Sequence, residues 1–269
     1  LRLQSREDRG FCACLLESGT RSMHSGRIED LLPLVEKAQI AWIDYIVDDI
    51  SKNAIETATK AGFSEALIRR LLRNGAERTH ARGSYEDFSS EMGLLIPTIR
   101  VKGFDVERQP LLILIKQSLV LTMHSGAILH FVQLHNYAEG ILRKLPLKEM
   151  KHDSLTLLLI RIIDENNSLN FEQVVEIEES SDIVSRQLAD AKSSRSLLGG
   201  EIYRMKHALV SYLSGLWATV DVLSSLRYGD ADMISDNPRV LDKIGSLIDD
   251  VHAQIGLAED LSHVLASGL

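Results

Sequence analysis

The pattern of apolar and polar residues changes its period near residue 150. Before that point, short runs of β-branched and aromatic residues alternate with segments whose apolar residues recur at helical spacing. The last two extended runs are so close together that they must pair as a hairpin. The pattern predicts strands at residues 10–16, 40–47, 93–101, 110–116 and 118–124.

Helices are predicted between and after these strands. Apolar spacing and end signals place them at residues 28–39, 53–60, 65–75 and 128–145. Pro97 should push its own strand toward an edge or a bulge, because proline cannot donate a hydrogen bond to a neighbouring strand. The predicted fold of residues 1–150 is therefore an α/β domain, a mixed β-sheet flanked by helices.

From Asp153 onward no convincing strand is found, and three segments follow a heptad rhythm typical of coiled-coil-like helices. The helical region, residues 151–269, is predicted to contain a hairpin at about residues 153–228, with Gly199 and Gly200 separating its two arms. A long final helix, at about residues 238–269, should start with Asn237 as cap and Pro238 in the first turn.

Charge narrows the possible partners. The 269 residues contain 30 basic and 38 acidic side chains, for a formal charge of -8. No cluster of Lys and Arg is long enough for a nucleic-acid backbone, so nucleic acid is excluded as a partner and cations are the more natural one. Residues 164–201 contain nine acidic residues and three basic ones. This acidic hairpin either attracts cations or is an ordinary solvated surface.

Other features of the chain carry little chemistry. The two cysteines, Cys12 and Cys14, have neither zinc-knuckle nor redox spacing, so they are reduced structural thiols or half of a metal site. His124, His130 and His135 are interpreted as helix and turn residues, since no nucleophile elbow, His-Glu-x-x-His motif or phosphate-binding loop accompanies them. No segment reaches the roughly 20 apolar residues of a membrane span. The sequence does not predict an enzyme.

The order of these elements resembles the cytoplasmic domain of the CorA family of divalent metal ion transporters. The resemblance rests on the stretches AWIDYIVDDI, SEALIRRLL, LLILIKQSLVLTMHSG, LLLIRIID, VVEIEESSDIV and LASGL, which together cover nearly the whole chain. It implies a homopentamer on the cytoplasmic face of the cell membrane, joined to the membrane by a C-terminal segment that this chain lacks. The family's pore segment and Gly-Met-Asn loop are absent from it.

The resemblance also implies metal sites. In the family, divalent ions held by carboxylates between subunits keep the pore closed, and Asp164 falls where one of these acids is placed. Where the family commonly has a Glu-Asp pair, this chain has Arg69 and Arg70, and Leu247 stands in the place of the partnering Asp.

Three residues near Leu247 offer a shifted site: Asp249, Asp250 and His252, of which the first and last share a helix face. The alternatives are an Arg-to-carboxylate contact in place of the ion and a plain polar helix face. Mg²⁺ prefers oxygen ligands, so a ligating His252 would favour Co²⁺ or Zn²⁺.

The sequence therefore predicts a cytoplasmic domain that senses Mg²⁺ or Co²⁺ and gates a CorA-like channel. The alternatives are a zinc-transporting relative of the same family and a helical scaffold whose seams associate without metal. An enzyme acting on a small molecule would need a concave site with converging polar groups, and the sequence indicates none.

Overall fold

A computed structural model describes residues 9–76, 84–126, 128–145, 151–189, 195–229 and 231–267. It contains one seven-stranded sheet whose strands lie in the order β2-β1-β3-β7-β6-β5-β4. β3 and β7 run parallel and every other neighbouring pair is antiparallel. The strands are β1 (Gly10–Leu16), β2 (Arg21–Gly26), β3 (Ala38–Val47), β4 (Ser84–Asp87), β5 (Glu91–Lys102), β6 (Asp105–Lys116) and β7 (Leu119–Ser125).

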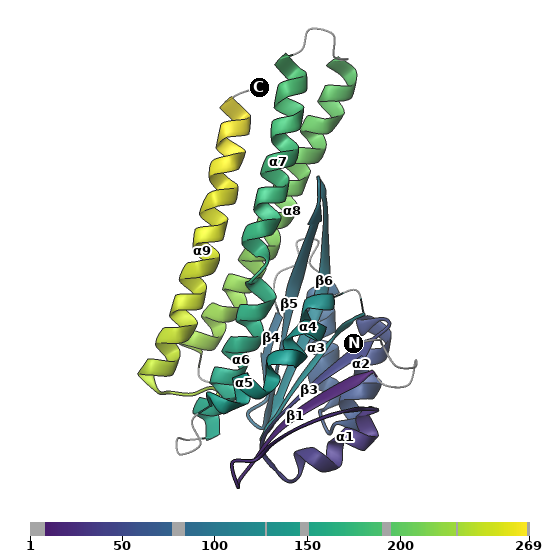
Figure 1. Cartoon of the computed structure of the whole chain (residues 1–269), viewed down its shortest axis with the longest axis vertical. Helices are drawn as coiled ribbons and strands as arrows, with labels where there is room; N and C mark the ends of the chain where they lie inside the picture. Colours follow the sequence, from purple (N-terminus) through teal and green to yellow (C-terminus); the bar gives the residue numbers. More distant parts are fainter. Residues whose placement is uncertain are drawn as a thin grey trace.

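Helices cover both faces of the sheet (Figure 1). Three pack on one face: α1 (Ile28–Val35), α2 (Ile50–Lys60) and α3 (Glu65–Ala76). The other face is covered by the rest of the chain: α4 (Leu129–Leu134), the 3-10 helix η1 (His135–Tyr137), α5 (Ala138–Arg143), α6 (Lys151–Asn167), α7 (Asn170–Ala189), α8 (Arg195–Tyr228) and α9 (Pro238–Ser267).

The alternation of side chains along each strand divides the core into two layers. In β6, Leu111 and Ile113 face α6 to α9, whereas Leu112 and Leu114 face α1 to α3. Both layers are buried, which explains why this strand is a continuous apolar run rather than an alternating one. The predicted mixed sheet with flanking helices, followed by long helices, is confirmed. The division of the chain into two domains near residue 150 stays a prediction.

Several details of the sequence prediction are wrong. β2 and β4 were not predicted, because edge strands are short and polar and show no clear alternation. The first predicted helix ends at Val35, since the chain already pairs with β1 from Ala38. Gly199 and Gly200 lie inside α8, and the connection from α7 falls within residues 190–194, outside the described part of the chain.

The predicted helix at residues 128–145 is broken into α4, η1 and α5. The break coincides with a contact between His135 and the sheet. Other signals are confirmed: Asn237 accepts a hydrogen bond from the backbone N–H of Arg239 at the start of α9, and Pro97 pairs with β6 beyond the end of β4, where β5 is an edge strand.

The long helices form a bundle that extends away from the sheet (Figure 1). α8 packs against α7, α9 and β5, and the buried hydroxyl of Tyr212 donates to the carbonyl of Asn170 at the start of α7, 2.6 Å away. Residues Gly199–Tyr228 are long and apolar enough to cross a membrane by length and composition alone, but 56% of the most apolar window is buried inside the protein. More than half of this window is thus covered by packing, while apolar side chains such as Val210 and Trp217 remain exposed.

Candidate functional site

One cleft of the described surface lies between α5, α6 and α9. It has a volume of about 940 Å³. Its apolar lining includes Leu157 and Ile160 of α6 and Leu247 of α9. Seven charged residues line it: Glu139, Arg143 and Lys144 near α5, Arg161 and Asp164 on α6, and Lys243 and Asp250 on α9.

Asp164 and Asp250, two predicted metal ligands from distant parts of the sequence, both line this cleft. The carboxylate of Asp164 accepts a hydrogen bond from Arg161 at 2.6 Å and its side chain is 44% exposed. A cation that binds Asp164 must therefore compete with the Arg161 guanidinium, which lies one helical turn earlier. Because four basic residues line the cleft against three acidic ones, this chain alone gives the cation no excess negative charge.

The other two predicted ligands do not join this pair. Asp249 is exposed and does not line the cleft. His252 is exposed and lies edge-on against the ring of Trp217 in α8, with ring centroids 5.6 Å apart. In the described ranges, no group of three or more His, Cys, Asp or Glu side chains is arranged to hold a metal ion. A metal site in the cleft would need ligands from another chain or from water.

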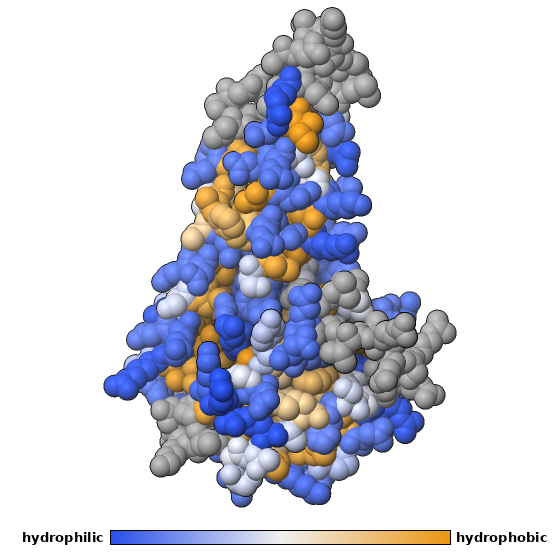
Figure 2. Space-filling model, viewed as in Figure 1, coloured by the Kyte–Doolittle hydropathy of each residue, from blue (hydrophilic) through white to orange (hydrophobic). Residues whose placement is uncertain are grey.

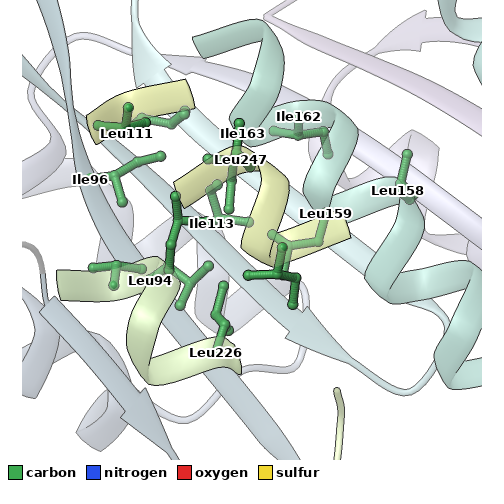
Figure 3. Packing of buried hydrophobic residues seen from close by; sticks show 14 of the residues in the cluster. Leu94, Ile96, Leu111, Ile113, Leu158, Leu159, Ile162, Ile163, Leu226 and Leu247 are labelled. Atoms are coloured by element: carbon green, nitrogen blue, oxygen red, sulfur yellow. The ribbon is translucent and has the colours of Figure 1, made fainter. Parts of the chain in front are cut away.

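The residues that depart from the family pattern lie on opposite faces of the sheet. Arg69 and Arg70 are on α3, where Arg69 pairs with Glu65 and Arg70 lies 3.5 Å from Glu86. Leu247 is on the other face and is only 4% exposed, packed among residues of α6 and the sheet (Figure 3). Within one chain, the arginines therefore cannot meet the carboxylates of α9.

A second polar site, which sequence reasoning missed, is buried in the sheet beneath α4 and η1. Asp44 of β3 is completely buried and accepts hydrogen bonds through Oδ2 from Nε2 of His124, at 3.1 Å, and from Nε2 of His135, at 2.8 Å. Its other oxygen accepts from the hydroxyl of Thr122, which itself accepts from the indole N–H of Trp42. His124 is therefore a strand residue of β7, not a helix or turn residue.

The two buried partners shift each other's titration. Burial alone would raise the pKa of Asp44, but the charge of His124 and the hydrogen bonds from His124 and His135 lower it well below its ordinary value. Burial opposes the charged form of His124, yet Asp44 and the carbonyl of Ser125 raise the pKa of this histidine above its usual 6.5. Both shifts favour a buried ion pair. His130 lies in α4, but its side chain is outside the described ones.

The cysteines are structural in their placement. Cys12 and Cys14 are free, fully buried against α1, and their Sγ atoms lie 3.3 Å apart. The hydrogen bond with Cys14, together with burial, raises the pKa of the Cys12 thiol. The same hydrogen bond lowers the pKa of the Cys14 thiol, against the effect of burial. The burial of both side chains agrees with the interpretation of this pair as core residues.

Comparisons with known proteins agree with this fold. The chain resembles the CorA magnesium transporter of Methanocaldococcus jannaschii, with 18% identity and a TM-score of 0.72, over 97% of this chain and 75% of that one. The soluble domain of the same transporter matches with a TM-score of 0.68 at 18% identity, over 96% of this chain and 94% of that one. The ZntB cytoplasmic domain of Vibrio parahaemolyticus matches with a TM-score of 0.55 at 13% identity, over 97% and 98%.

The sequence itself carries the family signal. No curated protein matches the chain in a sequence search. A family model, described as the CorA-like Mg²⁺ transporter protein, matches residues 37–268, which includes most of the sheet and all the long helices. The chain therefore belongs to the CorA-like Mg²⁺ transporter family.

Proposed function

We propose that this chain is the cytoplasmic metal-sensing and gating domain of a divalent cation transporter that carries Mg²⁺ or Co²⁺. The observation that supports the proposal most is that Asp164 and Asp250 both line one cleft, because carboxylate oxygens are the ligands that Mg²⁺ prefers. The role is regulatory rather than catalytic. Membership of the family supplies the transport function, and the chain would act on the cytoplasmic face of the membrane.

The cation would bind between copies of the chain, which we propose form a homopentamer. Asp164 and Asp250 are too few to hold an ion by themselves, so a neighbouring copy and water would complete its coordination. Asp249 would serve the same interface from the outer face of α9. The closed arrangement would then be favoured by mass action whenever the cation is abundant.

An exposed apolar stripe on α8 supports self-association. Tyr203, Val210 and Trp217 recur every seven residues and are 70%, 64% and 44% exposed, respectively. Figure 2 shows apolar residues among polar ones along the long helices. A heptad stripe of this kind is typical of a helix that packs against another. Sedimentation of the full chain with and without Mg²⁺ would measure the assembly, and a monomer under both conditions would contradict the pentamer.

A zinc-transporting relative is the second candidate. The similar fold of the ZntB cytoplasmic domain and the imidazole of His252 favour it. Ion preference distinguishes the two candidates. In the variant His252→Gln, Zn²⁺ should no longer bind, whereas the binding of Mg²⁺ should not change.

The linkage between cation and stability tests the proposal. At a free Mg²⁺ concentration about 100 times its dissociation constant, the free energy of unfolding should rise by about 2.7 kcal/mol, because only the folded chain offers the site. Urea unfolding with Mg²⁺ or with KCl at equal ionic strength measures this gain. The gain should vanish in the double variant Asp164→Asn/Asp250→Asn. Equal stability of the wild type with and without Mg²⁺ or Co²⁺ would favour a metal-independent scaffold instead.

A further inference from the structure

The buried network of Asp44, His124 and His135 connects the centre of the sheet to a wall of the cleft. Asp44 and His124 lie on neighbouring strands, β3 and β7. His135 begins η1, and the two residues that follow it, Asn136 and Tyr137, line the cleft together with α5. The ring of His135 also stacks on Phe11 of β1, with centroids 4.0 Å apart and planes 9° from parallel. One hydrogen bond to a buried carboxylate therefore helps to fix where this wall of the cleft stands.

The hydrogen bonds of His124 define its protonation state. Its Nδ1 lies 2.8 Å from the carbonyl oxygen of Ser125, and a carbonyl can only accept. Its Nε2 lies 3.1 Å from Asp44, whose carboxylate also accepts from Thr122 and His135. Both nitrogens of His124 must then carry a proton, so the ring is an imidazolium. Neither nitrogen keeps a lone pair for a metal ion, which separates this network from a histidine metal site.

We propose that Asp44, His124 and His135 form a proton-dependent latch that holds η1 against the sheet and so sets the shape of the cleft at Asp164 and Asp250. When His124 loses one of its two ring protons, one ring nitrogen can no longer donate to its acceptor oxygen, and that hydrogen bond is lost. The buried Asp44 carboxylate then lacks its positive partner. His135 is then hydrogen-bonded to a buried Asp44 carboxylate that has lost its counter-charge. The contact between η1 and the sheet weakens as a result.

Few other titratable groups surround this network. Phe131 of α4 packs against the ring of His124, whereas Phe11 of β1 and Trp42 of β3 pack against the ring of His135, and none of these three side chains titrates. β6 contributes the amide of Gln109, bound by Ser125. The charged groups of the neighbouring helices face elsewhere: on α6, Asp153 binds Ser235 and Asp164 binds Arg161, while Glu139 and Arg143 of α5 line the cleft.

The latch is tested without any metal, so its failure is separate from failure of the metal proposal. Full-length protein labelled with ¹⁵N-histidine would be titrated by NMR from about pH 5 to 9, with His124→Gln used to assign the signal. We expect both nitrogens of His124 to be protonated at neutral pH and its midpoint to lie above the ordinary 6.5. A midpoint at or below the ordinary value would overturn the proposal.

Hydrogen exchange of the backbone amides of residues 135–143 measures whether the protonation of His124 is coupled to the wall of the cleft. The exchange rates are corrected for the intrinsic pH dependence of amide exchange. Protection should fall as pH rises, with the same midpoint as His124. The variant His135→Gln should leave the His124 titration in place and remove the pH dependence of this exchange, which a merely structural role would not do. The control is Asp48→Asn, which changes an exposed carboxylate four residues after Asp44. Amide protection that does not change at the titration midpoint of His124 would contradict the latch.

Discussion

Replacing Asp44 with Asn is expected to lower the free energy of unfolding by about 3–5 kcal/mol at neutral pH, because it leaves the buried His124 imidazolium without its counter-charge. Urea unfolding measures the loss. The matched control is Asp48→Asn, which breaks a surface pair with Arg9 at a carboxylate that is 74% exposed and should cost less than about 1 kcal/mol. Equal losses in the two variants would show that the buried pair contributes nothing special.

The free energy of unfolding should depend on pH with opposite signs in the wild type and in Asp44→Asn. In the wild type, the raised pKa of His124 gives stability that is fully present below about pH 6.5 and is lost as pH rises through the folded value. The lowered pKa of Asp44 gives stability that is present above about pH 3.9 and is lost only in strong acid. In Asp44→Asn, burial lowers the pKa of His124 and only the hydrogen bond to the carbonyl of Ser125 opposes it, so stability should instead rise as pH approaches 6.5.

Leu247→Ala is expected to cost about 2–5 kcal/mol, the usual loss for a leucine removed from a tightly packed core. Leu247 joins α9 to α6 and the sheet (Figure 3). The control is Leu257→Ala on the same helix, where the side chain is 44% exposed and the change should stay within about 0.5 kcal/mol. Thermal or urea unfolding compares the two. A small loss at Leu247 would mean that α9 is not anchored at this point.

This position also explains a departure from the family pattern. An acid at position 247 would be buried at a place in the lining of the cleft that also includes the apolar Leu157 and Ile160. The nearby acids that remain available are Asp249 and Asp250, one helical turn or less away, and Asp250 reaches the cleft. The predicted shift of the site along α9 is thus compatible with the packing for Asp250. As a metal site it stays a prediction for Asp249, Asp250 and His252 alike.

Periodic elements could be predicted from the sequence, whereas those set by distant contacts could not. The heptad seams correctly indicated α7, α8 and α9, because one face of each helix is buried over the part whose side chains the structure describes. The edge strands β2 and β4 lack such a pattern. The break of the helix at residues 128–145 coincides with the hydrogen bond between His135 and Asp44, residues that are far apart in the sequence.

The same limit applies to the two sites. Asp44 gives one local signal, a single acid within the apolar strand AWIDYIV. Its partners follow only from the parallel pairing of β3 with β7, which sets Asp44 beside Thr122. Likewise, Asp164 and Asp250 reach one cleft because α6 packs against α9, and the apolar seams do not specify which helices become neighbours. Residue types could be selected from the sequence, but their grouping required the fold.

Direct titration of the full chain with Mg²⁺ by calorimetry tests the central claim, that the carboxylates of the cleft bind a divalent cation. We expect saturable binding in the wild type, at least a tenfold weaker affinity in Asp164→Asn/Asp250→Asn, and no change in Asp242→Asn, an exposed acid on α9. Arg161→Gln should strengthen binding, since it removes the guanidinium that competes for Asp164. Absence of binding, or equal binding in the wild type and the double variant, would contradict the account.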